Sequence, residues 1–351
     1  MPTLSVSFAD SSPRGRTKEV LQVGTAMGKR PIILHSLSFE RRALMYLSAT
    51  VCAPCTLLTF LRQEMGVSST LVKRLKWQGT LLVNGEPAHT DRRLMPGDVV
   101  AAELLEHADG FLPEDLPLDN LYEDAHLIAL DKPAGMLVHP SRCKNSGTLA
   151  NGLLHYYGRT GQACAIHPVS RLDRDTLGIV LLAKSAHVHA LFCRLHREHA
   201  IRKTYEALVF GAPDQDAGVI DLPIARCAGG SLLREISPDG KPAVSEFAVL
   251  ERRGGCAKLR LHPVTGRTHQ LRLHCLASGF PILGDPQYTT PAAKEFSDRC
   301  GLFTQQLCAV ALEFVHPVTG QPVTIRSHQA LLLPDSPNCA NASCNEGIYP
   351  I

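Results

Sequence analysis

Short apolar runs bounded by turn residues dominate the chain from residue 119 to residue 333. They have the length of buried strands and occupy His126–Leu130, Gly178–Ala183, Tyr205–Phe210, Val244–Leu250, Ala257–Leu261, Gln306–Phe314 and Val323–Ile325. Helical spacing of apolar residues interrupts them at a few places, such as Leu149–Tyr157, Ala186–His199 and His269–Ser278. The pattern predicts an α+β domain whose mixed sheet is mainly antiparallel.

A smaller unit with its own pattern precedes this domain, over residues 43–105. A strand is predicted near Ala43–Val51 and a helix over Thr56–Met65. A second helix starts at the hydroxyl-rich Ser68 and reaches Trp77. Short strands follow, joined by an Asn84-Gly85 turn and then a Pro-Gly-Asp turn. The region is therefore expected to be a small α+β module.

The second helix of this module is amphipathic. Its inward face is expected to carry Leu71, Val72 and Leu75. Lys73, Arg74 and Lys76 remain on the solvent side, where three cations within one turn can meet phosphates. Taken alone, the pattern also fits an ordinary small domain with a basic face.

The remaining segments lack periodic patterning. Residues 106–118 are acidic and contain two prolines, which predicts a linker. Residues 1–42 stay unassigned and are expected to be a flexible extension, and residues 334–351 are expected to be a disordered tail.

The uncharged stretch Ala43–Leu61 has the length of a bilayer span and follows Arg41 and Arg42. A membrane anchor is therefore one hypothesis. Pro54 and scattered hydroxyl residues interrupt the stretch, and part of it belongs to the first predicted helix of the module. We therefore favour a soluble protein without a membrane partner.

Composition supports a soluble globular protein, with 351 residues, 44% of them hydrophobic and 20% charged. The net charge of only +3 means that a nucleic-acid partner must be argued from local clustering. Such clustering exists between Arg252 and His274, which include six Lys or Arg residues, three histidines and no acid. The twelve cysteines are scattered, and only Cys52 and Cys55 form a CxxC pair, so we expect free thiols in a reducing cytoplasm.

Signatures of nucleotide-dependent enzymes, zinc peptidases and esterases are absent. One predicted helix carries His187, His189, His196 and His199, but their spacing supplies no closed tetrahedral ligand set. Solvated or phosphate-facing histidines are the favoured interpretation. We expect neither a metal nor a cofactor.

The stretch SRLDRDTLG at 170–178 places an aspartate between two arginines, before a buried strand. A surface turn with a charge pair is one interpretation, and a catalytic carboxylate on a loop is the other. Three further stretches are DKPAGMLVHPS at 131–141, RKTYEALVFG at 202–211 and HPVTGRTHQLRLH at 262–274. Each alone fits an ordinary turn, strand or helix start, whereas their order and separation together are specific.

In that order the stretches resemble the RluA-type pseudouridine synthases, over nearly all of residues 119–328. The resemblance implies the pseudouridine synthase fold and the isomerisation of uridine within RNA. It places the catalytic aspartate at Asp173 and its cationic partner at Arg267. An adjacent guanidinium lowers a carboxylate pKa by roughly one to three units, so Asp173 is expected to be ionised. Nucleophilic and basic roles for this carboxylate both remain open.

The resemblance also assigns substrate contacts. Tyr205, in KTY, matches a tyrosine that lies against the target base, and Arg171 matches an arginine that fills the gap or holds phosphate when the uridine leaves its stack. Arg174 and His269 are further candidates for substrate binding. Ser170 and Leu177 depart from the common family pattern, which bears on loop geometry and RNA preference.

The helical pair and ribbon at about 56–104 resemble the small RNA-binding module of ribosomal protein S-four, which assigns Lys73, Arg74 and Lys76 to RNA. We therefore expect a cytoplasmic, monomeric RNA pseudouridine synthase that acts on structured RNA. Large-subunit ribosomal RNA is the first expectation and transfer RNA the second, and no DNA partner is expected. The alternative hypothesis is an RNA-binding or ribosome-assembly protein whose catalysis is dispensable or lost.

Overall fold

The computed structural model describes residues 5–6, 42–107, 111–141, 144–227 and 233–334. The chain forms two compact units. Unit 1 contains Met1–Gly110 and Tyr157–Ala165, and unit 2 contains Phe111–Tyr156 and Ile166–Ile351. Almost all of the extension and the tail expected at the two ends lies outside the described residues.

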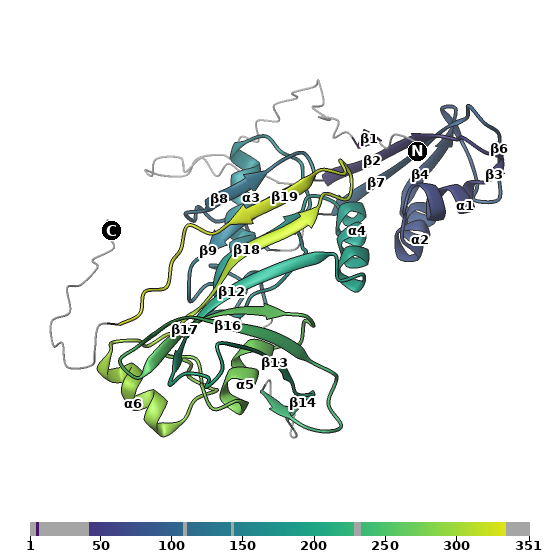
Figure 1. Ribbon diagram of the computed structural model, residues 1–351. Coiled ribbons are helices and arrows are strands. Elements are labelled where there is room, and N and C mark those ends of the chain that lie inside the picture. The colour runs from purple at the N-terminus through teal and green to yellow at the C-terminus, as the bar shows by residue number, and fades with distance from the viewer. Residues whose placement is uncertain (1–4, 7–41, 108–110, 142–143, 228–232, 335–351) are drawn as a thin grey trace, which may run out of the picture. The chain divides into compact units, whose positions relative to one another are not determined.

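Unit 1 is built on a five-stranded antiparallel sheet in the order β1-β2-β7-β4-β5 (Figure 1). Its strands are β1 (Ser5–Val6), β2 (Arg42–Thr50), β4 (Gly79–Val83), β5 (Glu86–Pro87) and β7 (Val99–His107). A separate pair joins β3 (Cys55–Thr56) and β6 (Arg93–Leu94). The helices are α1 (Leu57–Thr59), which continues into a π-helix (Phe60–Glu64), and α2 (Ser69–Gln78).

The predicted amphipathic helix is confirmed as α2. The Ser68 hydroxyl caps it by accepting a hydrogen bond from the N–H of Leu71 at 3.2 Å. Leu71, Val72 and Leu75 are buried in the core of unit 1, as their spacing predicts. The hairpin between β4 and β5 turns at Asn84 and Gly85, which both have positive φ.

The apolar stretch Ala43–Leu61 is divided between strand β2 and the helical segment that starts at Leu57. Among the described residues, no helix is long and apolar enough to cross a membrane.

Unit 2 contains a ten-stranded sheet whose main path is β13-β16-β17-β12-β18-β11-β9-β8. Its strands are β8 (Asp119–Glu123), β9 (Leu127–Lys132), β10 (His167–Pro168), β11 (Leu177–Ala183), β12 (Ile201–Phe210), β13 (Ala217–Asp221), β16 (Val244–Arg253), β17 (Cys256–Pro263), β18 (Leu307–Val315) and β19 (Pro322–Arg326). The pair of β11 with β18 is parallel, and the other pairs are antiparallel (Figure 1). The predicted α+β class with a mainly antiparallel mixed sheet is confirmed.

Four helices accompany this sheet: α3 (Leu149–Arg159), α4 (Ala186–Arg197), α5 (Gln270–Ala277) and α6 (Pro291–Arg299). Sequence periodicity predicts the first three helices but misses α6, because most residues of α6 are polar or small and form no clear apolar stripe. Its signal is local, because the Thr290 hydroxyl accepts the N–H of Ala293 and Pro291 occupies the first turn. A short ribbon, β14 (Ile224–Arg226) with β15 (Arg234–Ile236), was also not predicted.

Two apolar clusters fix α4 and α5 in unit 2. Val188 and Phe192 of α4 pack in one cluster with residues of β9 and β11. Leu271 and Cys275 of α5 pack in another with residues of β12 and β17. The start of α5 is thereby held beside the middle of the sheet.

Part of the predicted acidic linker is structured within unit 2. The boundary between the units falls at Gly110, and residues 111–118 lie against the start of α3. The Glu114 carboxylate accepts the N–H of Gly147 at 2.9 Å, and the Asn151 side chain donates to the Leu112 carbonyl at 2.7 Å.

Candidate active site

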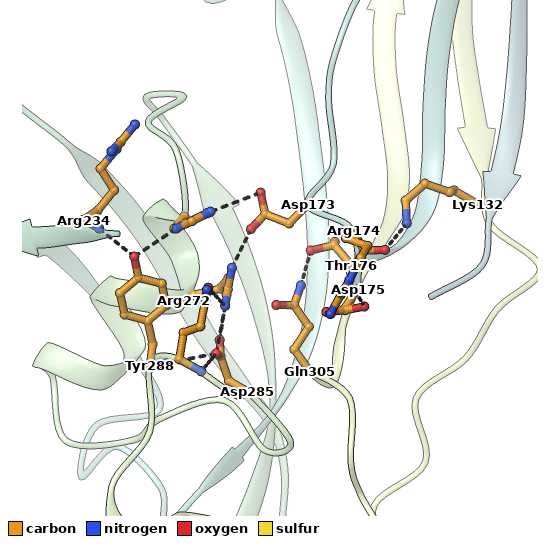
Figure 2. Close-up of polar contacts among 12 residues, drawn as sticks. Lys132, Asp173, Arg174, Asp175, Thr176, Arg234, Arg272, Asp285, Tyr288 and Gln305 are labelled. Atoms are coloured by element: carbon orange, nitrogen blue, oxygen red, sulfur yellow. Dashed lines mark hydrogen bonds and ion pairs between the residues drawn. The ribbon is translucent and has the colours of Figure 1, made fainter. Parts of the chain in front are cut away.

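Asp173 lies on the loop that connects β10 to β11. Strand β11, which follows the loop, requires glycine at position 178, where φ is 101° and a Cβ atom would overlap the backbone of Ala309 on the parallel strand β18. The loop closes on itself because Thr176 N–H donates to the Asp173 carbonyl at 3.2 Å. Gln305 also donates a short hydrogen bond to the Thr176 hydroxyl (Figure 2).

A buried lysine fixes the other side of this loop. Lys132, at the end of β9, donates to the Arg174 carbonyl at 2.8 Å (Figure 2). It also donates to the Pro133 carbonyl at 2.9 Å. Burial lowers the pKa of Lys132 to about 8, although the negative charges of Asp175 and Asp173 act to raise it. Lys132 therefore ties the backbone that follows Asp173 to the sheet.

The Asp173 carboxylate is paired with Arg272, the third residue of α5. Arg272 Nη1 lies 3.0 Å from Asp173 Oδ2, while Nε and Nη2 contact the two oxygens of Asp285 at 2.7 and 2.8 Å (Figure 2). The side chains of Arg272 and Asp285 are 5% and 0% exposed, whereas that of Asp173 is 30% exposed. The guanidinium thus presents one edge to an accessible carboxylate and is held from behind by a buried one.

Asp285 has its hydrogen-bonding capacity taken up by the protein. In addition to Arg272, its Oδ1 accepts the N–H groups of Gln287 and Tyr288, both at 2.9 Å. Burial by itself lowers the pKa of Arg272, but hydrogen bonds and charge from Asp285, then from Asp173, outweigh burial and raise it. Arg272 is therefore a permanently charged, fixed partner for Asp173.

The structure corrects the expected ion pair between Asp173 and Arg267. Arg267 precedes α5 and is exposed, and its Nε donates to the Pro242 carbonyl at 2.9 Å. Its backbone N–H is held by the Gln270 side chain, which fixes the turn before the helix. The guanidinium beside Asp173 comes from Arg272, because the turn directs Arg267 elsewhere along the same cleft.

His269 lies on the opposite side of the Asp173 carboxylate, with Nε2 at 3.9 Å from Oδ1. It has a left-handed backbone, φ 58°, and its Nδ1 lies 2.9 Å from the Tyr288 hydroxyl. That hydroxyl also accepts the N–H of Arg234 at 2.8 Å, so its own proton is available for His269 Nδ1. Burial lowers the pKa of His269, which favours a neutral ring with Nε2–H facing Asp173.

Tyr205 is on β12 at a register shift in the pairing with β18, where a bulge alters the direction of the strand. Its ring packs against the cluster that holds α5. Burial, followed by the nearby charge of Asp173, raises the pKa of Tyr205, so the hydroxyl is protonated at neutral pH. Asp173 and Tyr205 line the same cleft, as the sequence predicts for residues that share a substrate.

The cleft in unit 2 has a volume of about 1360 Å³, beyond the usual range of small-molecule pockets. Basic side chains line much of it: Arg171, Arg174, His196, His199, Arg202, Lys203, His262, Arg267, His269 and Arg272. Arg171 is exposed, while the Arg174 guanidinium is engaged by Asp175 at 2.8 and 3.0 Å. Such a wall suits a polyanion.

Lys203 is a basic group in this wall that sequence analysis did not single out. It lies two residues before Tyr205 on β12, and among the described residues it has no acidic partner. Burial lowers the pKa of Lys203, and burial together with the charges of Lys203 and His199 lowers that of His196. In the sequence, the position of Lys203 before the tyrosine in KTY was the signal that could have identified it as part of the cleft.

The other three predicted RNA contacts lie in unit 1. Lys73, Arg74 and Lys76 are on α2, and none of them forms an ion pair with a described residue. They therefore remain available to an external anion.

One group among the described residues has the donor spacing of a metal site: Asp119, Asp131 and His328. The oxygens of Asp131 already accept hydrogen bonds from the Ser327 hydroxyl, the His328 N–H and the Gln329 amide. Because protein donors satisfy this carboxylate, the cluster is explained by hydrogen bonding. The four histidines at 187–199 do not belong to it.

Comparison with known proteins agrees with this geometry. A family model described as RNA pseudouridylate synthase matches residues 126–277. A Bacillus subtilis protein named uncharacterized RNA pseudouridine synthase YjbO is 34% identical over 271 residues, covering 76% of this chain and 93% of that protein. Ribosomal large subunit pseudouridine synthase D of Vibrio parahaemolyticus is 35% identical, covering 72% of this chain and 81% of that protein.

Among solved structures, human RNA pseudouridylate synthase domain containing 1 has a TM-score of 0.50 and 24% identity. The structural match extends over 63% of this chain and 92% of the human protein, which supports the assigned fold. The sequence relatives carry the assignment further, because they match over most of both chains. The chain belongs to the RluA-type family of RNA pseudouridine synthases, enzymes that isomerise uridine to pseudouridine in RNA.

Proposed function

We propose that Asp173 is the catalytic carboxylate and that its reacting oxygen is Oδ1. The observation that carries this proposal is the Arg272 contact, which occupies Oδ2 at 3.0 Å, whereas Oδ1 has only the longer approach of His269 Nε2 at 3.9 Å among the described residues. The Asp173 side chain is 30% exposed and therefore accessible, and the fixed guanidinium beside it stabilises negative charge on the carboxylate. The proposed role moves the cationic partner from Arg267 to Arg272.

The reaction consists of breaking the bond between C1′ and N1, turning the base, and joining C1′ to C5. The proton lost from C5 is balanced by a proton gained at N1, so substrate and product are isomers. Oδ1 can act at C1′ as a nucleophile or remove a neighbouring sugar proton as a base, and both roles need an ionised oxygen beside the ribose. In each case Arg272 stabilises the negative charge of the Asp173 carboxylate, both before the reaction and after Oδ1 has separated from the ribose or lost the proton again.

The surrounding groups suit an extruded nucleotide. Tyr205 offers a ring against which the target uracil stacks, an interaction worth about 1 to 3 kcal/mol per base. Arg171 is exposed at the cleft, where a guanidinium can fill the vacated stack or hold a phosphate. Arg267 and Lys203 are positioned along the wall for backbone phosphates.

The proposed substrate is structured RNA in the cytoplasm, with large-subunit ribosomal RNA first and transfer RNA second. Relatives named for the ribosomal large subunit include proteins that are 35% and 38% identical to this chain. The alternative of an assembly factor without catalysis has less support, since Asp173, Tyr205 and a guanidinium partner share one cleft.

The test is the Asp173→Asn variant, which keeps the size of the side chain and removes its charge. We expect pseudouridine formation in vitro to fall by at least about 10³-fold while RNA binding persists. Asp216→Asn is the matched control, because Asp216 is an exposed carboxylate paired with Arg252 and does not line the cleft. Pseudouridine mapping of RNA from cells with each variant identifies the target. Wild-type turnover by Asp173→Asn would refute the assignment.

A further inference from the structure

Trp77 is the only tryptophan of the chain, and 85% of it is exposed. It is the next-to-last residue of α2. Among the residues that the structure describes, it has neither a hydrogen bond nor a ring contact. Tryptophan normally buries most of its large apolar surface, so an indole this exposed is unusual, and the side chains around it decide what it can bind.

The position of Trp77 on the helix groups it with cations. Residues three and four apart share a helix face, so Lys73, Arg74 and Trp77 lie together, opposite the buried Leu71, Val72 and Leu75. Lys76 flanks the tryptophan, and α2 contains no acidic residue. The cations make no ion pair with any described residue.

An exposed indole beside unpaired cations matches the chemistry of an unpaired nucleotide. The ring offers a face for a base, and the ammonium and guanidinium groups can meet the phosphates on either side. A protein partner would suit the apolar ring, but three unneutralised cations around it favour a polyanion.

We propose that Trp77, Lys73 and Arg74 form a binding site for a single-stranded nucleotide of the RNA substrate, with its base stacked on the indole. The proposal rests on the proposed function, because it assigns to unit 1 an RNA contact separate from the cleft that contains Asp173. The site extends the phosphate role expected of the basic face by adding recognition of an unpaired base. RNAs with a single-stranded segment are bound more tightly than continuous duplexes.

The full-length protein provides its own probe, because all tryptophan fluorescence comes from Trp77. We expect a short unstructured oligouridine to quench this fluorescence through stacking. Heparin, a polyanion without bases, is expected to bind the cations and leave most of the emission unchanged. Equal quenching by both would show that charge alone is responsible and would overturn the proposal.

Affinity measurements complete the test, using the anisotropy of labelled oligouridine. Trp77→Leu is expected to weaken binding by at least about 5-fold without changing the salt dependence, whereas Trp77→Phe retains most of the affinity. Lys73→Met is expected to reduce the slope of log affinity against log salt by about 0.7. Phe303→Leu is the matched control, since Phe303 is 73% exposed and does not line the cleft.

The Asp173→Asn variant separates this inference from the catalytic proposal. Quenching that persists in this variant supports the Trp77 site, whatever its activity. Unchanged affinity of Trp77→Leu would overturn the site even if the enzyme is active. Concentration-dependent self-association that Trp77→Leu abolishes, without loss of RNA affinity, would assign the indole to a protein interface and would also overturn it.

Discussion

The cleft of unit 2 that contains Asp173 and the outer face of α2 in unit 1 both present cations, but the two regions compensate the charge in opposite ways. Arg272 is 5% exposed and is saturated by Asp173, Asp285 and Gln287. The cations of α2 have no acidic partner among the described residues. A buried charge requires compensation, while a solvated charge does not.

This difference separates two tasks. The paired guanidinium cannot leave its position, so it can hold a reacting carboxylate in place without binding the substrate itself. Unpaired surface cations are free to neutralise phosphates in many arrangements, which gives affinity and salt dependence. The cleft is therefore organised for chemistry, and α2 is suited to association.

The largest effect is expected from replacing Arg272. Arg272→Met leaves the buried Asp285 without its partner, so the free energy of unfolding should fall by about 3 to 5 kcal/mol, and activity should be lost. Urea denaturation and single-turnover assays measure the two effects. Arg267→Met is the matched control for stability alone, because that exposed side chain makes one hydrogen bond with the described residues, to a backbone carbonyl.

A double variant tests the cause of this destabilisation. If the unpaired carboxylate is responsible, Arg272→Met combined with Asp285→Asn should recover part of the stability but none of the activity. If Arg267→Met and Arg272→Met lowered the free energy of unfolding equally, the distinction between a buried, paired arginine and a solvated one would be wrong.

Much of the fold could be predicted from sequence, because strand and helix periodicities are local properties. Ser68 capped α2 as expected, and the run Gly178–Ala183 became β11. The ribbon of β14 and β15 was missed, since segments of three residues carry too little periodicity. Residues 111–118 were expected to be a linker because they are acidic and contain prolines. Their contacts with Gly147 and Asn151 are tertiary and leave no local pattern in the sequence.

The site was predictable only in part for the same reason. The loop that carries Asp173 has a distinctive local sequence, but its partner is 99 residues away. Arg272 stands between Leu271 and Leu273 on a helix that is buried around it. Arg272 is compensated by two acids, Asp173 and Asp285. The second belongs to the sequence GDPQY at 284–288, which was the signal that could have identified Arg272 as the partner.

An intermediate effect is expected at Tyr205, where an aromatic ring lies in the same cleft as the paired charge. Tyr205→Leu removes the stacking surface and should reduce kcat/KM by about 5- to 150-fold, corresponding to about 1 to 3 kcal/mol. Tyr205→Phe keeps the ring, so recovery of kcat/KM assigns the role to stacking. If Tyr205→Phe is as impaired as Tyr205→Leu, the hydroxyl is required instead, and proton transfer becomes its role.

The smallest effect is expected in the dependence of stability on pH. It distinguishes unit 2, which contains buried histidines, from helix α2 of unit 1, which contains none. Burial lowers the pKa of several histidines of unit 2, including His269 and His274. Below pH 6.5 the unfolded chain takes up protons that these native side chains still exclude, so it binds more protons than the folded state. Stability is therefore lost progressively as pH falls from 6.5 toward the lower native pKa values.

His274 gives the sharpest version of this prediction, because Nε2 faces the Leu222 carbonyl at 3.0 Å and Nδ1 faces the Ser245 hydroxyl. The neutral ring satisfies both contacts by donating to the carbonyl and accepting from the hydroxyl. Urea midpoints between pH 8 and pH 5 should decline less steeply in His274→Gln than in the wild type. Helix α2 contains no histidine and no acidic residue, so RNA-induced quenching of Trp77 should persist wherever the protein remains folded. A midpoint that rises as the solution is acidified would contradict the assignment of neutral, buried histidines to unit 2.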